Sequence, residues 1–167
     1  MEKQIDGGAG ELQSLEYLRI GVDSCAGASV WPAELHSEYS TIKDNLVGRS
    51  FLPAGKNNPA ILDEGRRDYM LQIKGSSGAK RMKMRIAKVR KPLLSVAEMC
   101  DAGFDVMFRS KGMHRAVHQV TGEIIPIQRR GKVFEFEVKV LPEKSVSSSS
   151  VSTLEQQQRL GAAADRK

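Results

Sequence analysis

Apolar and polar residues alternate in short stretches of this chain, and this pattern limits the folds that it can adopt. A period of two places the apolar side chains on one face of a strand. The stretches with this alternation are residues 18–22, 69–73, 82–86 and 134–140. The segment Gly75–Gly78 has the composition of a hairpin turn, and Asp63–Gly65 predicts another turn before the strand around Tyr69. The pattern predicts a mostly β fold.

One segment has the signature of a helix start. Ser95 and Glu98 have the spacing of a capping box. In that motif the serine hydroxyl accepts a hydrogen bond from an early helical N–H, and the glutamate reaches back to the backbone of the serine. Val96, Met99 and Cys100 would form the apolar face, so we expect Cys100 to be buried. The sequence therefore predicts a mostly β architecture with one short helix, close to a small barrel.

Composition changes towards both ends of the chain. Residues 1–14 are rich in glycine and polar residues, which predicts a flexible leader. Residues 143–167 contain runs of serine, glutamine and alanine, which predict a disordered tail. We therefore expect one folded domain at residues 15–142.

Charge and cysteine content restrict the partners and the compartment. The net charge of +6 permits a nucleic acid or an acidic surface as partner without requiring either. The two cysteines, Cys25 and Cys100, cannot build a disulfide framework, and no secretory signal is evident. We expect reduced thiols in a cytoplasmic protein, with the nucleus as the alternative compartment. No apolar run is long enough to predict a membrane span.

Two histidines have a spacing that occurs in metal sites. His114 and His118 are four residues apart, which would suit a metal pair on a helix. The flanking residues predict a strand and a turn instead. We expect neither a metal site nor a cofactor.

The strand at residues 18–22 runs directly into a carboxylate, Asp23. Small residues follow it, namely Ser24, Cys25, Ala26 and Gly27. Small side chains let backbone approach backbone and let N–H groups point at the carboxylate. A strand that ends in an Asx-type turn has the same composition, and this stretch alone favours that simpler interpretation.

A later segment, Leu93–Phe108, changes the balance. It reads L-L-S-V-A-E-M-C-D-A-G-F-D-V-M-F. It resembles the segment L-L-S-V-x-x-L-C-D-x-G-[FY]-x-V-x-F of the retropepsin-like aspartic proteases of retroelement polyproteins, particularly the copia-type group. In that family a D-[ST]-G-A motif ends a strand, as Asp23–Ala26 does here. The turn at Thr121–Glu123 and the apolar strand at 133–140 also fit, so the resemblance covers roughly residues 15–142.

The resemblance implies a small closed β-barrel of retropepsin-like type with one short helix. It also implies the activity of an aspartic endopeptidase that cleaves a peptide or polyprotein substrate. Asp23 matches the catalytic aspartate, Ser24 the hydroxyl residue that braces the two loops of the dimer, and Ala26 the small residue after the glycine. Peptide hydrolysis by this class needs two carboxylates that share one proton. The chain offers no second motif, so a twofold homodimer would pair Asp23 with its symmetry mate.

The resemblance also implies a flap over the substrate, formed by residues 54–71. The match in this segment is carried by Gly55, Ile61 and Gly65.

The chain departs from the family at Cys25, where the motif has glycine. Glycine lets the loop bend tightly, whereas a side chain at this point must fit beside the dimer axis. Two outcomes stay open: the loop tolerates cysteine as one of the smaller replacements, or the side chain hinders the second loop and weakens or abolishes activity. The alternative to a protease is a catalytically decayed β-barrel that acts as a dimerisation module or binds peptide or nucleic acid.

The segment Lys80–Lys91 is the densest basic run. As a strand it would direct Lys83 and Arg85 to one face and apolar residues to the core. Single-stranded nucleic-acid binders usually interleave aromatic residues for base stacking, and this run has none. We expect a solvated edge strand and no nucleic-acid partner.

Overall fold

The computed structural model describes residues 17–53 and 58–143, and this part of the chain is mostly β, as predicted. It contains one short helix. The elements in chain order are β1 (Leu18–Asp23), β2 (Val30–Pro32), β3 (Ser50–Phe51), β4 (Ile61–Ile73), β5 (Ala79–Ala87), β6 (Leu93–Ser95), α1 (Val96–Asp101), β7 (Phe104–Met107), β8 (His114–His118), β9 (Ile124–Arg130) and β10 (Val133–Val140).

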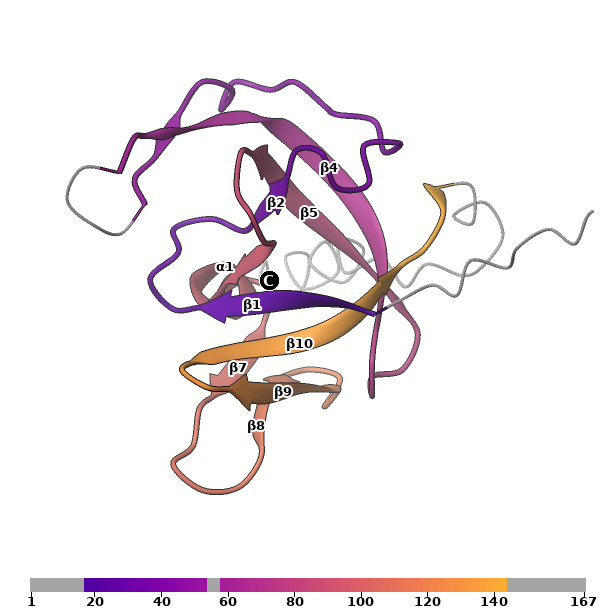
Figure 1. Cartoon of the computed structure of the whole chain (residues 1–167). Helices are drawn as coiled ribbons and strands as arrows, with labels where there is room; N and C mark the ends of the chain where they lie inside the picture. Colours follow the sequence, from indigo (N-terminus) through magenta and orange to yellow (C-terminus); the bar gives the residue numbers. More distant parts are fainter. Residues whose placement is uncertain (1–16, 54–57, 144–167) are drawn as a thin grey trace, which may run out of the picture.

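Six of these strands pair in a closed cycle (Figure 1). The order is β4, β5, β2, β6, β1 and β10, and β10 then pairs back to β4. The β1–β6 and β2–β5 pairs are parallel, so each brings together segments that are distant in the sequence. Strands β9, β8 and β7 continue the sheet from β10, and β3 forms a hairpin with β4. The cycle surrounds the core and leaves the end of β1 beside the start of α1.

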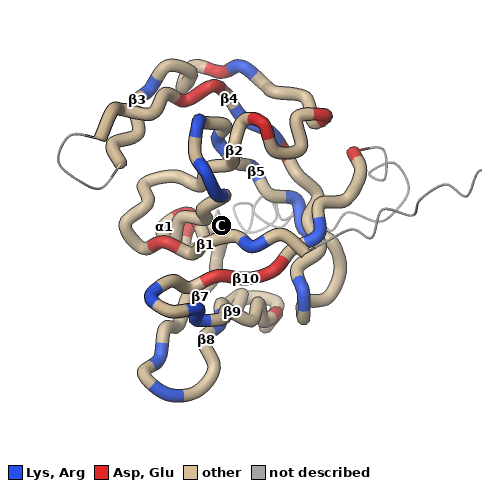
Figure 2. The backbone as a smooth tube through the Cα atoms, viewed as in Figure 1, with Lys and Arg blue, Asp and Glu red and all other residues tan. Residues whose placement is uncertain are grey.

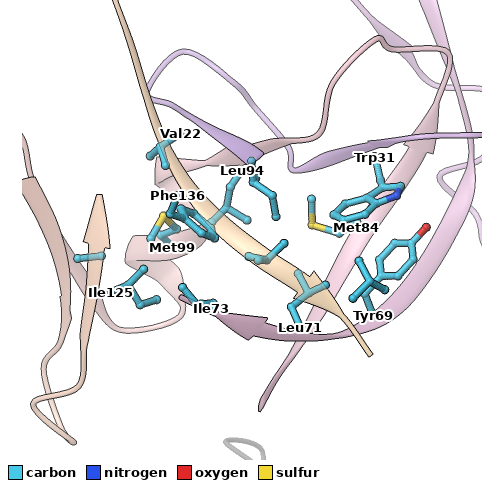
Figure 3. Packing of buried hydrophobic residues seen from close by; sticks show 14 of the residues in the cluster. Val22, Trp31, Tyr69, Leu71, Ile73, Met84, Leu94, Met99, Ile125 and Phe136 are labelled. Carbon is cyan, nitrogen blue, oxygen red and sulfur yellow. The ribbon is translucent and has the colours of Figure 1, made fainter. Parts of the chain in front are cut away.

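The predicted alternation places its apolar residues in one core. In β4, Tyr69, Leu71 and Ile73 are buried, and their side chains lie on the same side of the strand as the labelled core residues of the other strands (Figure 3). Trp31 of β2 stacks on Tyr69 with ring centroids 4.4 Å apart. Phe136 of β10 is also fully enclosed. Few aromatics are needed, because aliphatic and methionine side chains fill the remaining volume.

The turn expected at Asp63–Gly65 is not present. Strand β4 continues through these residues with a bulge, because the register against β5 shifts between Asp63 and Gly65. Gly65 adopts a φ of +132°, and its N–H donates a 2.8 Å hydrogen bond to Oδ1 of Asp63. Turn-forming residues therefore produce a bulge here, since both flanks stay paired with β5.

The basic run at Lys80–Lys91 is not the solvated edge strand that its pattern predicted. Strand β5 pairs along its length with β4, and its last residues also pair with β2. Arg85 is buried, because Asp63 and Asp44 enclose its guanidinium. The outer face of the strand is thus covered at this point.

Helix α1 begins at the predicted position but uses its capping residues differently. Oγ of Ser95 accepts a hydrogen bond from the N–H of Glu98 at 3.4 Å, as expected. The N–H of Ser95 donates to Oγ of Ser29, so Glu98 does not complete the capping box. Cys100 is exposed rather than buried, because the helix turns about 100° per residue and its inward side is centred on Met99.

Two predictions concern residues that are not described. The leader at 1–14 and nearly all of the tail at 143–167 lie outside the described residues. Within the described part, the helix has six residues, and no helix is long and apolar enough to cross a membrane.

Candidate active site

Strand β1 places Asp23 at its last position. Ile20 and Val22 point into the core, which fixes the phase of the strand, and Asp23 is half-buried at its end. β1 is held on both sides, by antiparallel pairing with β10 and by parallel pairing with β6. In the parallel pair Asp23 lies opposite Ser95. The two segments that carry the family resemblance are therefore neighbours, although about 70 residues separate them.

The carboxylate of Asp23 is held by the backbone that follows it. The N–H of Cys25 donates a 2.8 Å hydrogen bond to Oδ1 of Asp23. The small residues after Asp23 predicted that a backbone N–H would point at its carboxylate, and this bond is such a contact. The same bond defines an Asx turn. The catalytic interpretation and the simpler one share this bond.

The other motif residues lie on the outside of the loop. Ser24 and Cys25 are exposed, and Ala26 is half-buried. Among the described residues, His36 is the one non-glycine residue with a positive φ, so Cys25 needs no conformation reserved for glycine. The cysteine is therefore accommodated within one chain, and any crowding by its thiol would involve a second chain.

The predicted flap segment forms a hairpin in part. Ile61 is the first residue of β4 and pairs with Phe51 of β3, while Gly55 lies outside the described residues. Leu52 and Leu62 are strongly exposed on this hairpin. The hairpin and the loop after β1 extend towards the same side of the molecule (left in Figure 1).

Gly65 has a role at the base of the hairpin rather than at its tip. A Cβ at this position would lie 2.7 Å from the carbonyl oxygen of Ile42. Ile42 pairs with Arg66 through a pair of backbone hydrogen bonds of 2.8 and 2.9 Å. The glycine thus lets the segment before β3 pack directly against β4.

Sequence reasoning did not identify Ser29, the buried last residue of the loop that follows Asp23 (the Asp23 loop, residues 23–29). Its N–H donates to the carboxylate of Glu98 at 2.9 Å, and its carbonyl accepts from the N–H of Arg85 at 2.9 Å. The available signal was a single hydroxyl residue directly before the apolar pair Val30 and Trp31. Such a residue at the start of a buried strand requires an internal hydrogen-bond partner.

Charges, side chains of metal-ligating types and a surface hollow are further features of the part of the chain that the structure describes. Lys and Arg are spread over several elements (Figure 2). Within the described ranges, no group of three or more His, Cys, Asp or Glu side chains is arranged to hold a metal ion. A surface hollow of about 270 Å³ is lined by Tyr39, Ser40, Ile42, Asp68, Met70, Arg81 and Glu143. None of the predicted site residues contributes to its lining.

No family model, curated protein or solved structure matches this chain.

Proposed function

We propose that this chain is a retropepsin-like aspartic endopeptidase that acts as a homodimer through paired Asp23 carboxylates. The observation that carries the proposal is the parallel pairing of β1 with β6, which sets Asp23 opposite Ser95. Two separate sequence segments resemble the same family, and they lie side by side at Asp23, the residue that corresponds to that family's catalytic aspartate. The closed cycle of strand pairing is in keeping with the small barrel expected of such a domain.

The chemistry requires a second chain. In a carboxylate pair that shares one proton, the ionised member takes a proton from water while the water oxygen bonds to the peptide carbonyl carbon. The protonated member gives its proton to the amide nitrogen while the C–N bond breaks. One chain supplies one Asp23 at the end of β1, and a twofold axis beside the Asp23 loop would supply the other. The exposed side chain of Ser24 is then available to brace the partner loop.

Cys25 limits this activity in the proposal. Its exposed thiol takes the place of a hydrogen atom beside the proposed axis, so it would hold the two loops apart. The exposed thiol is also compatible with the alternative function, a decayed module that forms the dimer but does not cleave peptides.

The test compares the wild type, Cys25→Gly and Asp23→Asn in a peptide-cleavage assay at mildly acidic pH. We expect Cys25→Gly to cleave faster than the wild type, because the axis is less crowded. Asp23→Asn should lower the cleavage rate by at least about a hundredfold, because an amide cannot act as the base.

Sedimentation provides the control, since each variant must be a dimer at the assay concentration. An inert Cys25→Gly dimer would reject the protease and favour the decayed module. Equal cleavage by Asp23→Asn and its parent would reject the aspartic mechanism.

A further inference from the structure

We propose that Ser95, the N-cap residue of α1, and Glu98, in the first turn of that helix, are positioning residues that clamp the Asp23 loop. The catalytic consequence rests on the proposed peptidase function, whereas the clamp itself is a property of the folded chain. The helix start would thereby hold the carboxylate of Asp23 in the place where its symmetry mate can share a proton with it.

Three hydrogen bonds connect the helix start to the loop. Oγ of Ser95 donates to the carbonyl of Ala26 at 2.7 Å, and the N–H of Ser95 donates to Oγ of Ser29 at 3.0 Å. The carboxylate of Glu98 accepts from the N–H of Ser29 at 2.9 Å. The middle and the end of the loop are therefore both attached to the same turn of helix.

These bonds replace the second hydrogen bond of a capping box at the start of α1. In a complete capping box the carboxylate of Glu98 would accept from the N–H of Ser95. Here that N–H bonds to Ser29, and Glu98 bonds to the backbone of Ser29 instead. A contact that would stabilise α1 alone has been replaced by contacts that join α1 to the loop.

Burial makes the clamp costly to release. Ser29 is 1% exposed and Ser95 is fully buried, so water cannot readily replace a lost partner at either residue. Glu98 is exposed apart from its contact with Ser29, so its side chain can be replaced without opening the core. Glu98 is therefore the better residue for a test.

The clamp matters to the proposed reaction because the loop carries Asp23 at one end and Ser29 at the other. Two carboxylates that share a proton must approach within hydrogen-bond distance, and small displacements of reacting groups are costly. Release of the clamp would misplace the carboxylate in the transition state but leave the β3–β4 hairpin intact. We therefore expect kcat to change more than KM.

The first measurement is amide hydrogen exchange in four full-length variants: Glu98→Ala, Glu98→Gln, Ser95→Ala and Asp101→Ala. In Glu98→Ala and Ser95→Ala, exchange at the amides of Cys25 and Ser29 should be about tenfold faster than in the wild type. Glu98→Gln keeps an acceptor oxygen and should restore slow exchange. Asp101→Ala removes a carboxylate from the other end of the same helix and should leave the loop unchanged.

Exchange at Met84, in the centre of β5, reports whether a variant is destabilised as a whole. It should stay at the wild-type rate in Glu98→Ala. Unchanged exchange at Cys25 and Ser29 in Glu98→Ala would overturn the clamp, whether or not the protein cleaves peptides. Faster exchange at these two amides and at Met84 alike would overturn it as well, because the effect would then be global.

The second measurement is peptide cleavage, made in the Cys25→Gly background. Glu98→Ala should lower kcat about tenfold with KM within about twofold, and Glu98→Gln should recover most of the rate. Faster loop exchange with an unaltered kcat would overturn the positioning role. If the Cys25→Gly parent is inert, the proposed function fails, and faster exchange in Glu98→Ala still supports the clamp.

Discussion

At Arg85 a buried cation is held between two carboxylates from different parts of the chain. Its Nε lies 2.6 Å from Oδ2 of Asp63, and its Nη1 lies 2.6 Å from Oδ2 of Asp44. The hydrogen bonds to Asp44 and then to Asp63 raise the pKa of Arg85. The same contact with Arg85 lowers the pKa of Asp44 from 3.8 to about 2. This cluster ties the segment before β3 to the base of β4.

The cluster predicts an acid-dependent loss of stability. A carboxyl whose pKa is lowered by folding stabilises the fold above its unfolded value, and that contribution is lost as the pH falls through the folded value. For Asp44 the loss should lie between about pH 4 and pH 2. The free energy of unfolding, measured with urea, should therefore fall less steeply with decreasing pH in Asp44→Asn than in the wild type. Parallel declines in the two proteins would contradict the assignment.

At the scale of elements, β4 depends on one bulge. Its residues from Arg66 to Gln72 pair continuously with β5, and the bulge at Gly65 turns the first part of the strand towards β3. The positive φ of Gly65 and its close approach to Ile42 both require a residue without a Cβ. The hairpin proposed as a flap therefore joins the rest of β4 at a glycine, and a larger residue at this position should destabilise the fold.

Gly65→Ala should lower the free energy of unfolding by about 2–4 kcal/mol, because it adds backbone strain and a contact with a carbonyl oxygen. Gly78→Ala is the matched control. Gly78 has a φ of +70° in the β4–β5 turn, but a Cβ there meets nothing within 4 Å. Gly78→Ala should lower the free energy of unfolding by only about 1–2 kcal/mol. Equal losses in the two variants, measured by urea unfolding, would show that the packing at Ile42 does not matter.

At the scale of the whole molecule, the elements of the candidate site converge on one side. The Asp23 loop, the start of α1 and the β3–β4 hairpin are connected through the closed strand cycle. This arrangement supplies one carboxylate and exposes Ser24 and Cys25 next to it. Under the proposed function, the catalytic unit is therefore a pair of chains.

A paired site predicts that the cleavage rate per chain depends on protein concentration. For Cys25→Gly, the rate per chain should fall on dilution below the dissociation constant of the dimer, because monomers hold half a site. Two copies joined in one polypeptide should keep their rate on dilution. A constant rate per chain in a sample that sediments as a monomer would exclude the paired-carboxylate mechanism.

Local patterns were sufficient for several features of this protein. The alternation at residues 69–73, the strand at 82–86, the hairpin turn between them and the helix start at Ser95 are all present. Each depends on the spacing of side chains within a few residues, where backbone geometry leaves few choices. The carboxylate at the end of β1 was visible for the same reason. Its proposed catalytic role, in contrast, came from a family resemblance.

Other features were decided only by the tertiary structure. Glu98 would have completed a capping box, but the N–H of Ser29, 69 residues away in the sequence, became its partner. Arg85 is buried instead of solvated because Asp44 and Asp63 enclose its guanidinium. Asp63–Gly65 forms a bulge instead of a turn because both flanks pair with β5. In each case a local preference gave way to contacts between distant segments. Those contacts exist only once the strand cycle has closed.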